Sequence, residues 1–299
     1  MRSWILLICT LALCACTDQK MDKTDLVDPM IGTDGTGHTF PGATVPFGMV
    51  QLSPSNDFKG WAWCSGYHYQ DSVLKGFAHT HISGAGLTGL GDILFMPTTG
   101  KPQLLPGSET TPETGYRSRF SHEREHASAG YYEVYLDDYD IRVELTAGKR
   151  SGFHRYTFNK EGMGNVIIDP VHSVGESTLN AGVEFLSDTE IQGFKKSTGD
   201  AGTPRTVYFY ARFSKPFNGK GIYKEGEIME GIPAVQGDDV RAYVSFNMEA
   251  GEQIEAAVSL SFVDMEGAKA NFDSETSHFN FDQAWKNARN LWEEKLSKF

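Results

Sequence analysis

The sequence predicts a mainly β protein, a large antiparallel β-sandwich that ends in an amphipathic linker helix. The first observation is alternation, since many short segments alternate apolar and polar residues between clusters of Gly, Asp, Asn or Pro, as strands with one buried face do. The second is composition, with 32 Gly, 19 Phe and 12 Tyr residues. The third is the scarcity of helical periodicity before the last twenty residues. Repeated short strands of this kind favour two packed antiparallel sheets.

Six segments alternate most clearly, and we predict a strand in each: 131–136, 141–145, 153–158, 207–213, 242–246 and 254–262. The roughly 280 residues after the first fifteen are enough for one large all-β domain or two ordinary ones. No repeat of fixed period and no low-complexity tract divides them. We therefore expect a single sandwich over residues 27–276.

The final segment, 277–299, has a different pattern. Its apolar residues stand at helical spacing, and charged residues occupy much of the rest, so we predict an amphipathic helix. The apolar stripe is Phe281, Trp285, Ala288, Trp292 and Leu296. Such a stripe needs a partner surface, which is either the sandwich itself or a continuation of the chain. The spacing leaves both alternatives open.

The first residues have the pattern of an exported protein. Arg2 precedes an apolar run from Trp4 to Ala15, which is far shorter than the ~20 residues of a membrane-spanning helix and typical of a signal peptide. The run ends Leu13-Cys14-Ala15-Cys16, which resembles the bacterial lipobox. We therefore expect residues 1–15 to be removed, Cys16 to be lipidated and residues 16–26 to form a short tether. The alternative is an ordinary cleaved signal with a cysteine beside it by chance.

Cysteine usage and charge exclude several classes of protein. Once the signal is removed and Cys16 is lipidated, only Cys64 keeps a thiol, so we expect no intramolecular disulfide. Cys64 also lacks a second cysteine for a zinc site of the usual kind, and it is either buried packing or part of a pocket wall. The formal net charge of −12 argues against nucleic-acid binding, which needs a basic surface.

Candidate functional residues concentrate between residues 28 and 100. The glycine-rich stretch 32–37 lacks the helix and the Lys-Ser/Thr of a phosphate-binding loop, so it favours close approach of backbone to a ligand. Next, residues 60–69 hold Trp61, Trp63, Tyr67 and Tyr69 among small residues. Aromatic faces that stack on the C–H face of a sugar, with polar groups at its rim, are typical of a carbohydrate pocket. The alternative is that these aromatics are core.

Two histidines raise a second question, that of a metal site. His79 and His81 would share one face of a strand, as a pair of ligands does. No third ligand follows at short range, and Asp92 is the nearest carboxylate. Packed or hydrogen-bonded histidines are therefore the preferred interpretation, and we expect no metal in this chain.

Several ordered motifs together resemble the beginning of glycoside hydrolase family 92. They stand at 27–33, 37–54, 64–69, 76–84 and 91–97, and weaker similarity continues through 139–158 to the terminal helix. The resemblance implies an exo-acting, inverting α-mannosidase that acts on α-1,2-type mannosides of N-glycans or mannans. It also implies a sandwich joined by helices to an (α/α)₆ barrel, with calcium and the active site between them.

The resemblance also says which functions this chain would lack. Inverting hydrolysis needs a general acid and a general base on opposite sides of the bond. In family 92 both carboxylates and the calcium ligands belong to the barrel, and this chain ends where that barrel would begin. The resemblance therefore assigns no catalytic residue and no calcium ligand to this chain, and we expect the chain to be inactive alone.

The sandwich of such enzymes contributes loops to the sugar pocket. The matching positions here, our predicted substrate-binding residues, are Gly37, His38, Trp61, Cys64, Ser65, Gly66 and Tyr67. Trp61 is the preferred stacking surface. Leu87 and Gly89 depart from the family pattern, which often has a cysteine and an acidic residue there, and Trp63 stands where a smaller residue is common.

Two functions therefore stay open. The chain is either the sugar-binding portion of a lipid-anchored α-mannosidase whose barrel is encoded separately or lost, or a lipid-anchored carbohydrate-binding protein in its own right. Either one would bind a mannose-containing glycan at the cell envelope, on the periplasmic or surface side of the outer membrane. The terminal helix discriminates between them, because a self-sufficient protein covers Trp285 and Trp292 with its own surface.

Overall fold

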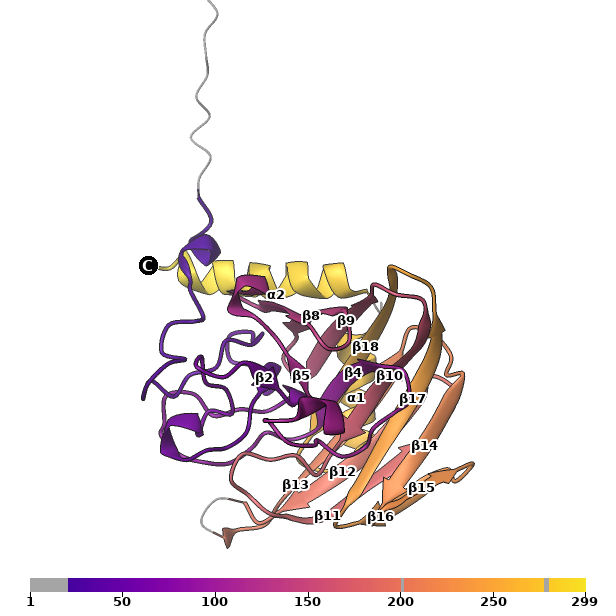
Figure 1. Ribbon diagram of the computed structural model, residues 1–299. Coiled ribbons are helices and arrows are strands. Elements are labelled where there is room, and N and C mark those ends of the chain that lie inside the picture. The colour runs from indigo at the N-terminus through magenta and orange to yellow at the C-terminus, as the bar shows by residue number, and fades with distance from the viewer. Residues whose placement is uncertain (1–20, 200–201, 277–279) are drawn as a thin grey trace, which may run out of the picture.

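The computed structural model describes residues 21–199, 202–276 and 280–299. Two antiparallel sheets pack face to face, which confirms the predicted β-sandwich, and two helices lie outside the strands (Figure 1). The predicted signal segment and Cys16 lie outside the described residues. Among the helices of the described part, none has the length and apolar character that a membrane span requires.

The smaller sheet has seven strands. In spatial order they are β1 (Ser53–Ser55), β3 (Gly76–Ala78), β4 (Leu94–Thr99), β10 (Gly162–Asp169), β17 (Val240–Met248), β14 (Gly219–Lys224) and β15 (Glu227–Glu230). A separate two-stranded ribbon pairs β2 (Val73–Leu74) with β5 (Ser118–Arg119).

The larger sheet has nine strands. Their order is β16 (Ala234–Gly237), β11 (Thr178–Phe185), β12 (Glu190–Ser197), β13 (Arg205–Phe213), β18 (Glu252–Ser261), β9 (Ser151–Phe158), β8 (Ile141–Ala147), β7 (Tyr131–Leu136) and β6 (Glu125–Ser128). All six strands predicted from alternation are present. β7 has the predicted bounds, and β8, β9, β13 and β17 run a few residues further.

The core between the sheets is rich in aromatic rings. Phe95 of β4 stacks on Phe213 of β13 at a centroid distance of 6.2 Å, and Phe246 of β17 packs 5.8 Å from the same ring. All three side chains are buried. Burial of aromatic and branched side chains from both inner faces is the main stabilising contribution in such a sandwich.

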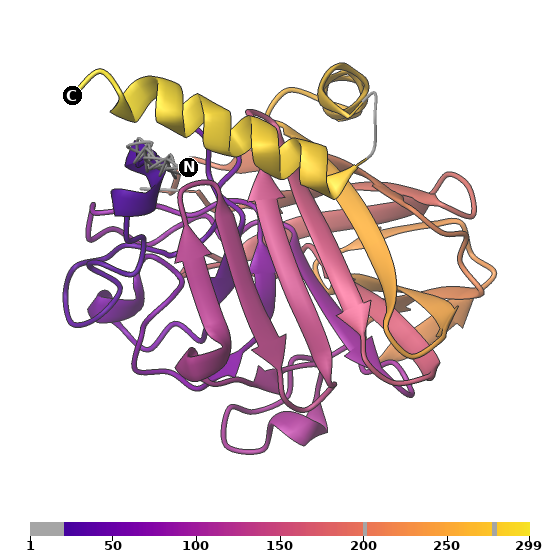
Figure 2. The same cartoon turned by 90° about the horizontal axis from the view of Figure 1, so that it is seen from above.

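Two helices form a third layer on the outer face of the larger sheet. The short helix α1 (Met265–Glu275) was not predicted; it begins at Asp264, whose carboxylate accepts the amide hydrogen of Gly267, and it packs Phe272 4.8 Å from Tyr210. The predicted terminal helix is α2 (Phe281–Leu296), capped by Asn280. Figure 2 shows α2 running across the strands of this sheet.

The tryptophan stripe of α2 faces the sandwich. Trp285 lies 4.9 Å from the ring of Tyr131, and the Trp292 indole donates a hydrogen bond to the carbonyl of Thr44 at 2.6 Å. Both tryptophans are partly buried, and Arg289 ties the helix to Asp22 and Asp25 at the start of the described chain. The sandwich therefore supplies the partner surface that the stripe needs.

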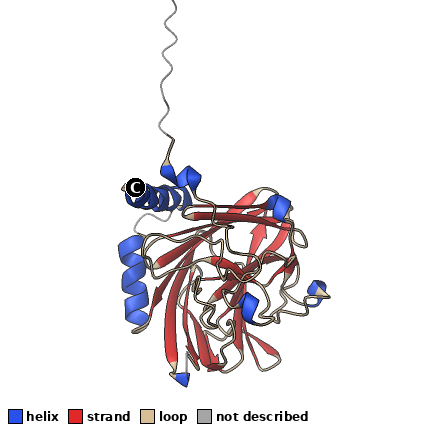
Figure 3. Cartoon of the chain, turned by 90° about the vertical axis from the view of Figure 1, so that its left-hand side faces the viewer, coloured by secondary structure: helices blue, strands red, loops and turns tan. Residues whose placement is uncertain are grey.

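The segments before residue 120 gather on one side of the molecule, largely as loops (Figures 1 and 3). Four short 3₁₀ turns interrupt them or follow them: η1 (Lys23–Leu26), η2 (Trp61–Trp63), η3 (Pro112–Thr114) and η4 (His122–Arg124). This loop side carries every residue that the sequence predicts for the substrate site.

Candidate functional site

Trp61 is the exposed residue at the centre of the candidate site. It opens the turn η2 and leaves 61% of its surface accessible. Its indole N–H donates to the carbonyl of Gly86 at 2.9 Å, and its ring meets that of His38 edge to face, with the centroids 4.3 Å apart. A large aromatic that is held at its edge while its surface stays open is suited to stack on a ligand.

His38 stands beside Trp61 in a left-handed backbone conformation, with φ of 56°. Its carbonyl accepts a hydrogen bond from the amide of Gly84 at 2.6 Å, which fixes the loop. The side chain is 7% exposed, and its Nε2 has no hydrogen-bond partner among the described residues. A buried polar atom without a partner carries a cost, which a hydroxyl that reached this nitrogen would relieve.

Glycines make the close contact between these side chains achievable. A Cβ at Gly86 would lie 3.2 Å from both His38 Nδ1 and Trp61 Nε1, and its φ of 63° also favours glycine. Gly37, the residue before His38, is needed for a different reason: a Cβ there would lie 2.2 Å from the carbonyl oxygen of Gly32. Gly37 is exposed and lets the loop fold tightly on itself.

A buried ionic network holds the loop of Gly84 and Gly86 against the larger sheet. Asp92, at the end of that loop, accepts from Lys195 at 2.9 Å and from Arg205 at 3.0 Å. Burial raises the pKa of Asp92, but the two cations and the Thr80 hydroxyl outweigh it, so the net pKa is lowered. The carboxylate therefore stays charged and anchors the loop that contacts Trp61.

The other four predicted residues lie in the interior beneath Trp61. Cys64 and Ser65 are each 1% exposed, and burial raises the pKa of the Cys64 thiol. Gly66, with φ of 88°, packs against His81, where a Cβ would lie 2.9 Å from the imidazole. Tyr67 points inward and donates to Glu125. The structure thus brings Trp61 and His38 together and buries Cys64 through Tyr67, of which Cys64 donates its amide hydrogen to the Trp61 carbonyl at 3.2 Å.

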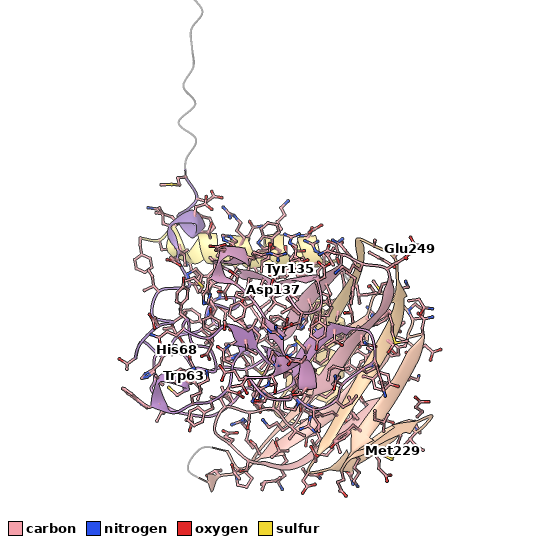
Figure 4. The ribbon with its side chains drawn as sticks, viewed as in Figure 1. Trp63, His68, Tyr135, Asp137, Met229 and Glu249 are labelled. Carbon is pink, nitrogen blue, oxygen red and sulfur yellow. The ribbon has the colours of Figure 1, made fainter. Side chains whose placement is uncertain are left out.

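Two further aromatic pairs lie near the site. Trp63 stacks on His68 with centroids 4.2 Å apart, and Tyr69 stacks on His122 at 4.0 Å. Figure 4 labels Trp63 and His68 together on the loop side. His122 is a contribution that the sequence did not reveal, because it comes from η4, more than fifty residues further along the chain.

The histidine pair considered as metal ligands has other partners. His79 is fully buried, and its Nδ1 lies 2.5 Å from the carbonyl of Ile93 while its Nε2 lies 3.0 Å from Nε2 of His154. His81 lies between the Ser55 hydroxyl and the Gln51 carbonyl. In residues 21–199, 202–276 and 280–299, no three His, Cys, Asp or Glu side chains form a metal-binding group.

The geometry of the loop side suits recognition of a neutral polyhydroxylated ligand. Trp61 offers an apolar face, His38 offers a ring nitrogen, and the loop backbone around Gly37 and Gly84 is exposed. Carbohydrates present an apolar C–H face and a rim of hydroxyls, which these groups complement.

This chain is similar to known glycosidases. The sequence model of the Glycosyl hydrolase family 92 N-terminal domain matches residues 26–261. A curated relative from Arthroderma benhamiae, named an uncharacterized secreted glycosidase, is 25% identical over 304 residues and is covered over 38% of its length.

Solved structures of family GH92 enzymes are also similar to this chain. A family GH92 alpha-mannosidase from Bacteroides thetaiotaomicron superposes with a TM-score of 0.89 and 37% identity, over 94% of this chain and 38% of that one. The same enzyme with mannoimidazole gives a TM-score of 0.89 and 36% identity, over 93% and 37%. An inverting family GH92 mannosidase of that organism gives 0.77 and 25%, over 93% and 36%. This chain therefore spans about two fifths of the length of the relatives that it matches.

Proposed function

This chain belongs to glycosyl hydrolase family 92 through its N-terminal domain, and on that basis we propose that it is the sugar-binding portion of an exo-acting α-mannosidase. The substrate class is α-1,2-type mannosides of N-glycans or mannans, hydrolysed with inversion by the complete enzyme. The observation that carries the proposal is Trp61, an exposed indole fixed by Gly86 and His38. Support also comes from the relatives whose names specify mannosidases, one of them with mannoimidazole bound.

In this proposal each residue of the site has a separate role in sugar binding. Trp61 stacks on the C–H face of the mannose next to the scissile bond, and His38 Nε2 hydrogen-bonds a hydroxyl at the rim of that sugar. Gly37 lets its loop fold tightly on itself, which leaves space for the sugar beside Trp61. Cys64, Ser65, Gly66 and Tyr67 are buried and act on the ligand through the position of the Trp61 loop. Linkage preference then depends on the wall near Leu87, which is 54% exposed.

In this proposal a barrel domain outside this chain carries out catalysis. The acid and base carboxylates and the calcium site lie in a barrel, supplied as a separate chain or as a further part of the protein, and this chain alone is inactive. The described residues do not fit a calcium cage, since they contain no suitable group of three ligands.

We place the protein at the cell envelope, anchored through lipid on Cys16. Support comes from the short apolar run and the Leu13-Cys14-Ala15-Cys16 sequence, and from a relative that is named as secreted. One acyl chain would hold a protein only marginally, whereas the several chains of a bacterial lipoprotein anchor it stably.

A second candidate function is a lipid-anchored carbohydrate-binding protein that works without a barrel. One observation favours it: Trp285 and Trp292 pack on Tyr131 and Thr44 of the same chain. Both candidates use the same site around Trp61, so loss of the Trp61 side chain should weaken sugar binding in each.

We expect Trp61→Ala to weaken mannobiose binding at least tenfold, which corresponds to about 1.4 kcal/mol. The substitution removes the stacking face and leaves the buried support intact. Isothermal titration calorimetry of the protein with α-1,2-mannobiose measures this change. Phe47→Ala is the matched control, because that side chain is 95% exposed and lies away from Trp61, near Trp292. Equal affinities for the wild type and Trp61→Ala would remove Trp61 from the site.

A further inference from the structure

A groove crosses the outer face of the smaller sheet, over β10, β17, β14 and β15. Its cavity volume is about 950 Å³, at the upper end of the range of small-molecule binding clefts. We call it the β14 groove; its lining includes Met163, Asn218, Gly219, Tyr243 and Asn247. It lies far from Trp61: Figure 1 shows β14 and β15 on the side away from the N-terminal loops, and Figure 4 places Met229 of β15 opposite Trp63.

β14 has two glycines on its outer face, and one of them, Gly219, lines the groove. In the sheet register, Gly221 stands opposite Tyr243 and Gly219 stands opposite Ser245. Gly221 has a packing reason, since a Cβ there would lie 2.6 Å from the Tyr243 ring. Gly219 has none: its nearest neighbour would be 3.6 Å away, and its φ is not positive. Glycine in a strand weakens the strand and often marks close approach of a ligand.

Polar side chains of Asn218, Ser245 and Asn247 line the floor of the groove, and hydrogen bonds hold the first two in place. Asn165, fully buried, donates to the carbonyl of Gly100 at 2.8 Å and accepts from the Ser245 hydroxyl at 2.6 Å. At one end, Asn218 accepts the backbone amide of Asn247 at 2.8 Å, and the Asn247 side-chain amide makes no hydrogen bond to the described residues. Amides and hydroxyls that are held in place can pair with the hydroxyls of a sugar chain.

The walls of the groove are apolar. Met163 is 48% exposed and Ile228 is 47% exposed, and they stand on β10 and β15, on either side of the open strip. Between them lies the Tyr243 ring, whose hydroxyl is 3.4 Å from Glu230. Apolar surface beside fixed polar groups matches the alternating C–H and hydroxyl faces of a carbohydrate.

Charge narrows the ligand class. Lys101 and Glu230 are the two ionic groups of the lining and have opposite sign, so the groove has no net charge. The whole chain carries a formal charge of −12, which repels anionic polymers. A peptide strand would pair along the open edge of β15, whereas the groove runs over the face of the sheet. A neutral glycan is the class that fits.

We propose that the β14 groove is a second glycan-binding surface, which takes a neutral α-mannan chain independently of Trp61. The choice of mannan among neutral glycans rests on the proposed function. The groove would hold an internal stretch of the polymer, because it is open on the sheet face, and Trp61 would meet a chain end.

The test blocks the groove without touching Trp61. Gly219→Val fills the open strip, and the 3.6 Å spacing shows that the added Cβ fits without a clash. Affinity electrophoresis in soluble α-mannan, with the full chain, should show at least a tenfold loss of retardation affinity for Gly219→Val and a small loss for Gly219→Ala. Gln253→Val, at an exposed position of β18 in the other sheet, is the matched control and should not change the affinity.

Separate outcomes overturn the two proposals. Unchanged mannan affinity in Gly219→Val overturns the groove, and so does groove-dependent binding of an uncharged peptide or a β-glucan in place of mannan. If the valine variant is unstable on thermal unfolding, Asn247→Ala, which removes an exposed amide, replaces it with the same expected loss. Mannobiose binding in calorimetry should stay unchanged in both groove variants, whereas Trp61→Ala should lose it. A failure at Trp61 therefore leaves the groove result unaffected.

Discussion

Replacing Lys195 by methionine should lower the free energy of unfolding by about 3–5 kcal/mol. Lys195 and Asp92 are both completely buried, 2.9 Å apart, and the ammonium also donates to the carbonyl of His172 at 2.6 Å. Methionine keeps the volume but leaves a carboxylate in the interior with Arg205 as its one remaining cation. Removing one partner of a buried ion pair is among the most destabilising changes that a single substitution produces.

Urea unfolding at neutral pH measures this loss. Lys269→Met is the matched control, because Lys269 pairs with Asp273 one helical turn away in α1 and both side chains are exposed. Exposed pairs of this kind contribute about 0.5 kcal/mol or less. A loss below about 1 kcal/mol in Lys195→Met would mean that the network does not anchor the site loop as the structure indicates.

Acidification from pH 7 to pH 5 should destabilise the protein by about 2 kcal/mol for each of His79 and His81. Burial lowers the pKa of both imidazoles from 6.5 to about 4. Between pH 6.5 and pH 4 these imidazoles are protonated in the unfolded chain but not in the folded chain. The free energy of unfolding therefore falls as the pH drops through 6.5 toward 4. Below about 4 both states are protonated and this contribution stops changing.

Burial keeps His79 and His81 neutral, and the hydrogen bonds of His79 fix its tautomer. The Ile93 carbonyl can only accept, so His79 Nδ1 carries the hydrogen and its Nε2 must accept from His154 Nε2. His154 Nδ1 then accepts from the Tyr156 hydroxyl. A proton added to His79 Nε2 would place two donors face to face in the interior, and burial also holds the pKa of His154 well below its usual range.

Urea unfolding at pH 7 and pH 5 gives the pH dependence directly. His81→Gln keeps a polar group beside Ser55 and removes one titrating ring, so its loss between the two pH values should be smaller by about 2 kcal/mol. Lowered carboxyl pKa values, such as that of Asp57, act at lower pH and do not enter this window. Equal stability of the wild type at pH 7 and pH 5 would contradict the buried, neutral assignment.

Most of the fold could be predicted from the sequence, and the exceptions have physical reasons. Strand β7 alternates because one of its faces is solvated, so its bounds are evident. β10 ends in a run that is buried on both faces, Asn165 to Asp169, and a continuous run of this kind does not distinguish a strand from a buried helix. Helix α1 buries only Ala268 and Phe272, which is too narrow a stripe to predict a helix.

The sequence predicts which segment carries the site, but not which of its side chains are exposed or in contact. Trp61 and Tyr67 stand six residues apart in one aromatic cluster, yet the first is exposed and the second is completely buried. The turn η2 and the positive φ of Gly66 separate them, and neither is evident from aromatic composition. The contacts of Trp61 with His38 and Gly86 span more than twenty residues of chain, so only the folded structure reveals them.

If Trp61 is the sugar-stacking residue of this domain, its indole N–H signal should respond to α-1,2-mannobiose in a ¹H–¹⁵N NMR titration. Trp285 and Trp292 serve as internal controls, because they pack on the sandwich beneath α2. The predicted result is a saturable shift of the Trp61 indole signal, which reports on its hydrogen bond to Gly86, while the signals of Trp285 and Trp292 stay in place. A Trp61 signal that does not move at saturating mannobiose would contradict the claim.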